Sequence, residues 1–227
     1  TIKFSIKNLR HNLRSKAVLC PGLEVNFVNE IDETTDKWLF EDGIKDYLQA
    51  SLDGLDCIPA IPFVISSKTK EEQLNCALTW TENTTNTTAE SFVNLIPTIG
   101  GGTHVNGLRS GLTDALKEFC EFRSLIPKNI KLTPDDIWQN IASVLSIKIL
   151  DPQFSGQTKE RLSSRECASF VSGVVKDSFS LWLNQHTDIA EKIAELAILN
   201  AQIRLKTAKK VIRKKIVSGP ALPGKLS

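Results

Sequence analysis

The feature that most constrains this chain is a change of hydrophobic periodicity near residue 150. Before that point apolar residues fall in short runs, the last at residues 142–150, which are typical of β-strands. From residue 163 onward they recur at helical spacing, which predicts two long helices at residues 163–185 and 187–217. Sheet-forming runs followed by a purely helical part predict an α+β fold.

The segments before residue 150 predict a mixture of helices and strands. Helices are expected at residues 2–19, 43–52 and 105–122, and a short helix begins at Pro134 with Thr133 as its N-cap. Strands are expected at residues 25–29, 37–40, 63–66, 73–80 and 91–97. The last two flank a loop rich in Thr and Asn, which suggests a meander. Pro59 and Pro62 are assigned to a loop.

Composition excludes several classes of protein. The chain has 227 residues and a net charge of +2, so a nucleic-acid surface would have to be local. Its five cysteines lack C-x-x-C spacing and it has three histidines, which predicts reduced thiols in a cytosol rather than a zinc site. No apolar run is long enough to span a membrane, and no signal peptide opens the chain. Because it begins at Thr1 and lacks methionine, we expect a piece of a longer protein.

Two short motifs allow a functional and a structural interpretation. Three glycines at residues 100–102 precede a predicted helix and could bind an anion, but a tight turn is favoured because the spacing matches no phosphate-binding motif. His104 is interpreted as a helix-end contact rather than a catalytic base. Asn83 and Asn86 begin formal glycosylation sequons, which are interpreted as part of a polar hairpin loop.

The predicted C-terminal helix carries a dense run of positive charge. No acidic residue interrupts the run between residues 204 and 215, and such a run favours contact with the phosphates of DNA. Contacts of this kind would not read bases. The seven cations are Arg204, Lys206, Lys209, Lys210, Arg213, Lys214 and Lys215.

The loop at residues 151–164 places Gln157, Thr158 and Lys159 between a strand and a helix. Residue type alone favours a solvated surface position for Lys159, since lysines are mostly exposed. A functional role for this loop is predicted only from a resemblance to a known family.

Four segments carry a resemblance to a known family: NLIPTIGGGTHVNGLRSGL, DPQFSGQTKERLSS, FVSGVVKDSFSLWLNQ and AKKVIRKKIVSGPALPGKLS. They resemble the B subunit of bacterial topoisomerase IV and, less closely, gyrase B, both type IIA topoisomerases. The resemblance covers essentially the whole chain and implies the transducer domain. It implies a body similar to ribosomal protein S5 domain 2 at residues 1–186, a stalk helix at 187–217, and a linker at 218–227 toward an absent metal-binding cleavage domain.

The resemblance also implies roles for individual residues. Gln157 and Lys159 match a family motif that contacts the γ-phosphate of ATP bound on a neighbouring domain, with Lys159 catalytic. A second set is expected to face DNA: Arg109, Lys206, Lys209, Lys210, Arg213 and Lys214.

The resemblance further implies cofactors and partners for the full-length protein. Its cofactors would be ATP and Mg²⁺, neither bound by this piece alone, which would be inactive. Its partners would be DNA, the A subunit of topoisomerase IV and, with ATP, a second copy of the same B subunit. The implied location is the bacterial cytoplasm, away from membranes, and the implied process is chromosome segregation.

Two other interpretations remain open from the residues themselves. A small-molecule kinase on the same fold would need its own phosphate-binding loop, for which only residues 100–102 are available. A free-standing module that binds the DNA backbone would use the basic helix and would bind in a salt-sensitive way.

Overall fold

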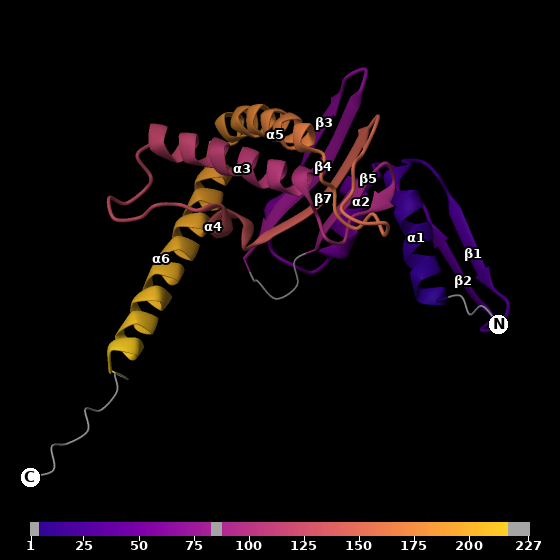
Figure 1. The fold of residues 1–227 in the computed structure, drawn as a ribbon, viewed down its shortest axis with the longest axis horizontal. Helices are drawn as coiled ribbons and strands as arrows, with labels where there is room; N and C mark the ends of the chain where they lie inside the picture. Colours follow the sequence, from indigo (N-terminus) through magenta and orange to yellow (C-terminus); the bar gives the residue numbers. More distant parts are fainter. Residues whose placement is uncertain (1–4, 83–87, 218–227) are drawn as a thin grey trace, which may run out of the picture.

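The computed structural model describes residues 5–82 and 88–217, and the side chains of residues 209–217 are not described. A sheet-and-helix body lies between a small N-terminal unit and a long C-terminal helix that projects away from it (Figure 1). The predicted α+β architecture with a long C-terminal helix is therefore confirmed. In chain order the elements are α1 (Ile6–Leu19), β1 (Val25–Asn29), β2 (Thr34–Trp38), α2 (Ile44–Ser51), β3 (Cys57–Lys68), β4 (Glu72–Thr81), β5 (Ala89–Val93), β6 (Ile96–Pro97), α3 (Thr103–Phe122), α4 (Pro134–Trp138), β7 (Ile141–Ile149), α5 (Arg165–Gln185) and α6 (Thr187–Val217).

The main sheet has five strands in the order β3-β4-β7-β5-β6, and β1 and β2 form a separate two-stranded sheet. All neighbouring pairs in the main sheet are antiparallel except β5 and β7, which are parallel. Parallel neighbours need a crossover connection, and α3 and α4 provide it. The predicted meander of the strands at 73–80 and 91–97 is therefore wrong, because β7 lies between β4 and β5.

The bounds of other strands also differ from prediction. β2 begins at Thr34 rather than residue 37, since Thr34 and Thr35 already pair with β1. The predicted strand 91–97 is two strands, broken where Asn94 and Leu95 adopt positive φ angles of 48° and 67°.

Strand β3 is much longer than the predicted 63–66, because it runs through the two prolines that were assigned to a loop. It is an edge strand, so each proline can lack an N–H donor without breaking the sheet. The register with β4 shifts between Ile58 and Phe63, which accommodates the prolines in an irregular stretch.

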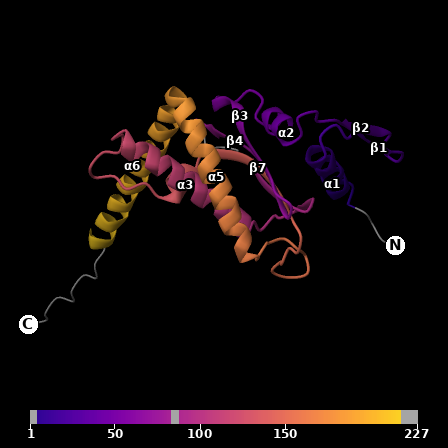
Figure 2. The ribbon, with the colours of Figure 1, turned by 90° about the horizontal axis from the view of Figure 1, so that it is seen from above.

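The two faces of the main sheet are covered differently. Helices α3 and α5 lie side by side over one face and enclose the larger core with residues such as Leu74, Leu145 and Phe179 (Figure 2). The predicted inward positions of α3 are confirmed, since Leu108, Leu112, Leu116 and Phe119 are buried. On the other face α1 and α2 pack a smaller apolar cluster against part of the sheet.

Helices α3 and α5 approach closely because α3 has glycine where they cross. A Cβ atom on Gly107 would lie 2.5 Å from the carbonyl oxygen of Ala168, and one on Gly111 would lie 2.7 Å from that of Ser172. These distances are below any normal contact. Gly107 and Gly111 are one helical turn apart and share a face. Any side chain at either position would force the two helices apart.

We predict that Gly111→Ala lowers the free energy of unfolding by about 1–3 kcal/mol, the usual range for overpacking a core. Gly173→Ala is the matched control, since Gly173 lies on α5 with open space around its Cβ position. There the helix propensity of alanine should be neutral or stabilising by up to about 1 kcal/mol. Chemical denaturation of both variants measures the difference, and equal stability would show that the helices do not need the close approach.

Candidate functional site

The loop between β7 and α5 has a fixed base and an exposed tip. At the base, Leu162 forms a bridge with Phe154 within the loop and a second bridge with Gly102 at the start of α3. Leu162 is only 1% exposed and belongs to the main core. The backbone N–H of Ser155 donates to the carbonyl of Arg161 at 2.9 Å, closing the neck of the loop. The tip, residues 156–160, is exposed.

The three glycines at residues 100–102 hold this loop. The N–H of Gly100 donates to the carbonyl of Glu160 at 2.9 Å, and the N–H of Leu162 donates to the carbonyl of Gly101 at 3.1 Å. A Cβ atom on Gly102 would lie 2.3 Å from the carbonyl oxygen of Leu162. The prediction of a tight turn is confirmed, and the structure adds its reason: without side chains, the turn can touch the neighbouring loop backbone.

The N-terminus of α3 is capped by the same loop. The N–H of Thr103, the first residue of α3, donates to the carbonyl of Leu162 at 3.1 Å. That carbonyl satisfies one of the donors that a helix start leaves open. An anion at this position would compete with Leu162, so the structure disfavours the kinase interpretation of the glycine motif.

His104 is a buried contact at the start of α3, as predicted. It is fully buried, and its Nε2 lies 3.0 Å from Oγ1 of Thr98, which also donates to the carbonyl of Ser91. Burial lowers the pKa of His104 to about 4, so the imidazole is neutral at neutral pH. The residue therefore links β5, the glycine turn and α3.

Gln157 and Lys159 lie together on the exposed tip of the loop. Within the described residues, neither side chain has a hydrogen-bond or ion-pair partner. Lys159 has a positive φ angle of 56°, which is uncommon for a residue other than glycine. The tip therefore presents one ammonium group and one amide, both free to engage a group outside the chain.

Arg109, predicted to face DNA, lies between α3 and α4. Its guanidinium forms an ion pair with Asp135 and lies 5.2 Å from the centre of the Trp138 ring. The side chain is 32% exposed, so one side of it remains accessible. Its orientation toward DNA stays a prediction.

The basic run of α6 divides into a fixed part and a free part. Arg204 is the first cation of the predicted basic run, but its Nε and Nη2 donate to the two carboxylate oxygens of Asp136, each at 2.8 Å. Arg204 is therefore a structural clamp. Lys206 is exposed. The side chains of Lys209, Lys210, Arg213 and Lys214 lie outside the described residues, although their backbone belongs to α6.

The partner of Arg204 is the acidic residue of a capping box at α4. Burial by itself would raise the pKa of Asp136, but hydrogen bonds from Arg204 and Thr133 outweigh it and hold the pKa below its ordinary value. Asn200, one turn before Arg204, donates to the carbonyl of Asp136 at 2.9 Å and to Asn140 at 2.6 Å. Sequence reasoning found the N-cap at Thr133 and missed this network, whose only local signal was an aspartate three residues after the cap.

Other groups give no further catalytic centre in the described part of the chain. The five cysteines are free, and Cys76, Cys120 and Cys167 are buried. No cluster of three or more His, Cys, Asp or Glu suited to a metal ion occurs among the described residues. None of the helices described is both long and apolar enough to cross a membrane.

Comparison with known proteins identifies the class of protein. The DNA gyrase B family matches residues 43–212, and the chain belongs to that family. Within it, the chain is 59% identical to the B subunit of DNA topoisomerase 4 from Haemophilus influenzae and 55% identical to that from Escherichia coli, over 99% of this chain in both cases. It spans about a third of the length of these relatives, 36% of each.

Solved structures agree with this assignment. The ATP-binding domain of Francisella tularensis topoisomerase IV, solved with a small-molecule inhibitor, superposes with a TM-score of 0.77 at 41% identity. The match covers 90% of this chain and 55% of that one. The 43K ATPase domain of Thermus thermophilus gyrase B, solved with an aminocoumarin, gives a TM-score of 0.78 at 27% identity, covering 94% of this chain and 57% of that one.

We predict that Gly102→Ala loosens the base of the 151–164 loop, because the new Cβ cannot coexist with the carbonyl of Leu162. Hydrogen-exchange protection of the N–H groups of Leu162 and Thr103 should fall, and the free energy of unfolding should fall by about 2 kcal/mol or more. Gly156→Ala is the control in the same loop, since Gly156 also has a positive φ, of 89°, but open space around it. Its free energy of unfolding should fall by only about 1 kcal/mol, the cost of placing alanine at a positive φ angle. Equal protection in both variants would contradict the docking role of Gly102.

Proposed function

We propose that the chain is the transducer part of the B subunit of an ATP-dependent type IIA DNA topoisomerase. It relays ATP binding and hydrolysis to closure of a DNA gate and to strand passage. The similarity to the B subunit of topoisomerase IV over nearly the whole chain supports this, as do the ATP-binding regions among its structural neighbours. The observation that carries the proposal is the loop at residues 151–164, whose base is fixed in the core while Lys159 extends from it without a partner among the described residues.

The residues of the tip fit a contact with the γ-phosphate of ATP held by another part of the full-length protein. Lysine is a compact charge with three donors on a flexible stem, and Gln157 adds a neutral donor. A preorganised cation can stabilise charge that develops on a transferring phosphoryl group. The proposal gives this chain only the phosphate contact, and it assigns the binding of ATP and Mg²⁺ to the rest of the full-length protein.

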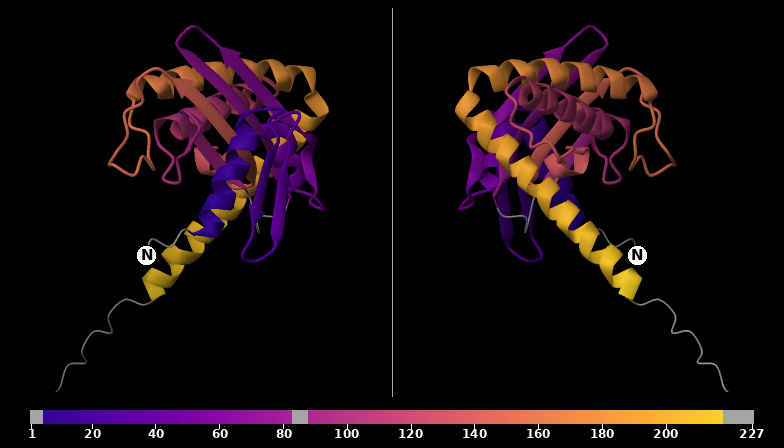
Figure 3. Two further views of the ribbon diagram at one scale, coloured as in Figure 1. Left: turned by 90° about the vertical axis from the view of Figure 1, so that its right-hand side faces the viewer. Right: turned by 90° about the vertical axis from the view of Figure 1, so that its left-hand side faces the viewer.

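The fold suggests how a change at the tip would reach the rest of the molecule. The loop leads directly into α5, which packs along α3 and is followed by α6 after one residue. The ion pair between Arg204 and Asp136 fixes the middle of α6 to the body. Movement of the loop would therefore rotate a packed helical unit with its projecting stalk, rather than bend a single segment (Figure 3).

The remaining parts of the proposal concern partners. The full-length protein would act in the bacterial cytoplasm with DNA, with the A subunit of topoisomerase IV and, when ATP is bound, with a second copy of itself. Residues 187–217 would form the stalk, and residues 218–227 would lead to the cleavage domain. Arg109 and the exposed cations of the stalk would line the passage for DNA through phosphate contacts.

We predict that Lys159→Ala in the full-length protein still binds ATP but loses ATP turnover by about 10²-fold, the usual cost of removing one preorganised transition-state donor. Strand passage driven by ATP should be lost with it. Lys159→Arg should rescue poorly, since a planar guanidinium does not replace a compact ammonium. Steady-state ATPase assays measure the effect.

The matched control for that assay is Lys128→Ala. Lys128 is also an exposed loop lysine, but it follows the C-terminal end of α3, whereas the 151–164 loop contacts its N-terminal end. The control should keep the parent rate. An ATPase rate of Lys159→Ala within about twofold of the parent, or an equal loss of rate in Lys128→Ala, would contradict the proposed contact between Lys159 and the γ-phosphate.

We further predict that this chain alone binds duplex DNA weakly and with a steep dependence on salt. Each phosphate contact contributes about 0.9 to the slope of log K against log salt. Replacing Lys209, Lys210, Arg213 and Lys214 by Gln should therefore flatten the slope by about 2–4. The control replaces four lysines outside this run, Lys7, Lys117, Lys128 and Lys192, with the same change in net charge. An unchanged slope in the stalk variant, or an equal flattening in the control, would contradict the proposal that the stalk faces DNA.

A further inference from the structure

One end of the sheet face that carries α1 and α2 is left uncovered. The apolar row Val64, Ala77 and Val144 runs across β3, β4 and β7, and Ala77 and Val144 are buried in the cluster with α2. The next two rows on the same face are polar. They contain Ser66, Asn75 and Ser146, and then Lys68, Gln73 and Lys148. A pocket of about 460 Å³ opens over the last row.

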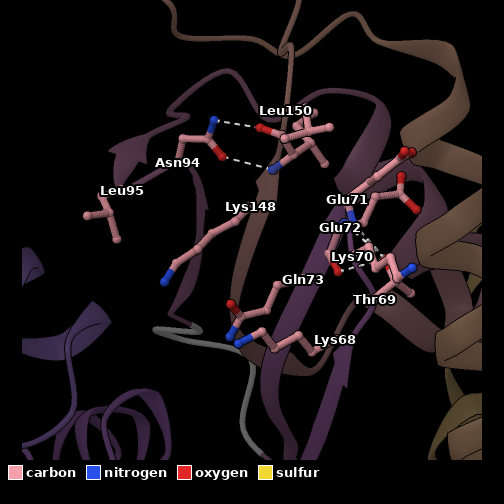
Figure 4. A pocket seen from close by; sticks show the side chains of 11 residues that line it. Lys68, Thr69, Lys70, Glu71, Glu72, Gln73, Asn94, Leu95, Lys148 and Leu150 are labelled. Carbon is pink, nitrogen blue, oxygen red and sulfur yellow. Dashed lines mark hydrogen bonds between the residues drawn. The ribbon is translucent and has the colours of Figure 1, made fainter.

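The outer row places two lysines on either side of one glutamine. Gln73 pairs with Lys68 on one neighbouring strand and with Lys148 on the other. Strands lie about 4.8 Å apart, so the two lysine backbones are about 10 Å apart and their long side chains can converge on one ligand. In Figure 4 the side chains of Lys68, Gln73 and Lys148 extend to the same side of the sheet.

Neither lysine is neutralised within the described residues. Both are exposed, and neither forms an ion pair with a described acid. Glu71 and Glu72 also line the pocket, but they lie on the side away from the ammonium of Lys148 (Figure 4). The side chain of Glu72 faces α5, where Glu166 is close enough to affect it. The space between the lysines is therefore positive.

The inner row adds a donor with a fixed orientation. Oγ of Ser66 donates to Oδ1 of Asn75 at 2.8 Å, which leaves the amide nitrogen of Asn75 without a hydrogen-bond partner among the described residues. The nearby Asn94 is held in place by two hydrogen bonds, because its amide donates to the carbonyl of Ile149 at 2.8 Å and accepts from the N–H of Ile149 at 2.9 Å. Asn94 is thus fixed against β7 as one wall of the pocket.

We propose that this face, built from Lys68, Gln73, Asn75 and Lys148, binds an oxyanion of the phosphate class. Two converging ammonium groups and two amide donors match the oxygens of one tetrahedral phosphate. The phosphate can be free inorganic phosphate or a phosphodiester of nucleic acid, and the two share the same recognition chemistry. The surface lies on the opposite sheet face from α3 and α5 and is separate from the loop at residues 151–164. The inference does not depend on the proposed function.

The test is a titration of the ¹⁵N-labelled chain, followed by NMR, with inorganic phosphate in one arm and a short blunt DNA duplex in the other. We expect at least one probe to shift the backbone amides of Gln73, Asn75 and Lys148 in a saturable way. The double variant Lys68→Gln/Lys148→Gln should bind that probe about tenfold or more weakly, because it loses both charge-assisted hydrogen bonds. The control Lys7→Gln/Lys128→Gln has the same net charge and two equally exposed sites.

The two arms distinguish the sources of the phosphate. A response to phosphate alone assigns a small-anion site, and a response to the duplex alone assigns a contact with the nucleic-acid backbone. The absence of a localised response to both probes would overturn the proposal. Equal weakening in the control would overturn it as well, since the binding would then follow net charge rather than this face.

Discussion

The close contact between α3 and α5 is the constraint on which the rest of this structure depends. Gly107 and Gly111 let the α5 backbone approach to a distance that no side chain would permit. Successive contacts, from Gly107 against Ala168 to Gly111 against Ser172, show that the helices run parallel. Two parallel helices start at the same end, so the segment that leads into α5 necessarily lies beside the start of α3. This packing brings the loop at residues 151–164 to the start of α3, where the glycine turn holds it.

The loop then combines two properties that usually exclude each other. Its base is anchored in the core, because Leu162 is buried and its carbonyl caps α3. Its tip has few constraints and holds a charged side chain in the solvent. A long cation on a rigid base loses little backbone entropy when it engages a ligand, because the base is already ordered. In the proposed function, the same rigidity passes a displacement of Lys159 to α5 rather than absorbing it.

Local sequence patterns predicted the local features and failed for the non-local ones. The helices, the buried face of α3 and the cap at Thr133 follow from short spacings, and the structure confirms them. The position of β7 between β4 and β5 does not follow, because strand order depends on how a distant helix pair packs. The predicted β3 is too short because proline disfavours a central strand, whereas β3 is an edge strand, which tolerates it. For the site, the residue pattern alone predicts that Lys159 is a solvated surface lysine. Its proposed contact with the γ-phosphate still rests on the resemblance to the family.

Arg204 shows why charge counts along a helix can mislead. In sequence it belongs to an uninterrupted basic run, yet its guanidinium is bound to a carboxylate that is only 2% exposed. Without Arg204, the buried Asp136 carboxylate would carry an unpaired charge, which would lower the free energy of unfolding. The ion pair is therefore stabilised mainly by the cost of leaving Asp136 unpaired. The lowered pKa of Asp136 means that this stabilisation is present above the pKa of an unfolded aspartate and is lost as pH falls through the lowered value. Asn200 and Arg204 thus fix the middle of α6 to the body, while Lys206 and Ala208 beyond them are exposed. None of the described α6 side chains beyond Arg204 belongs to the core. In the proposed function, this outer part of α6 would carry a rotation of the body outward.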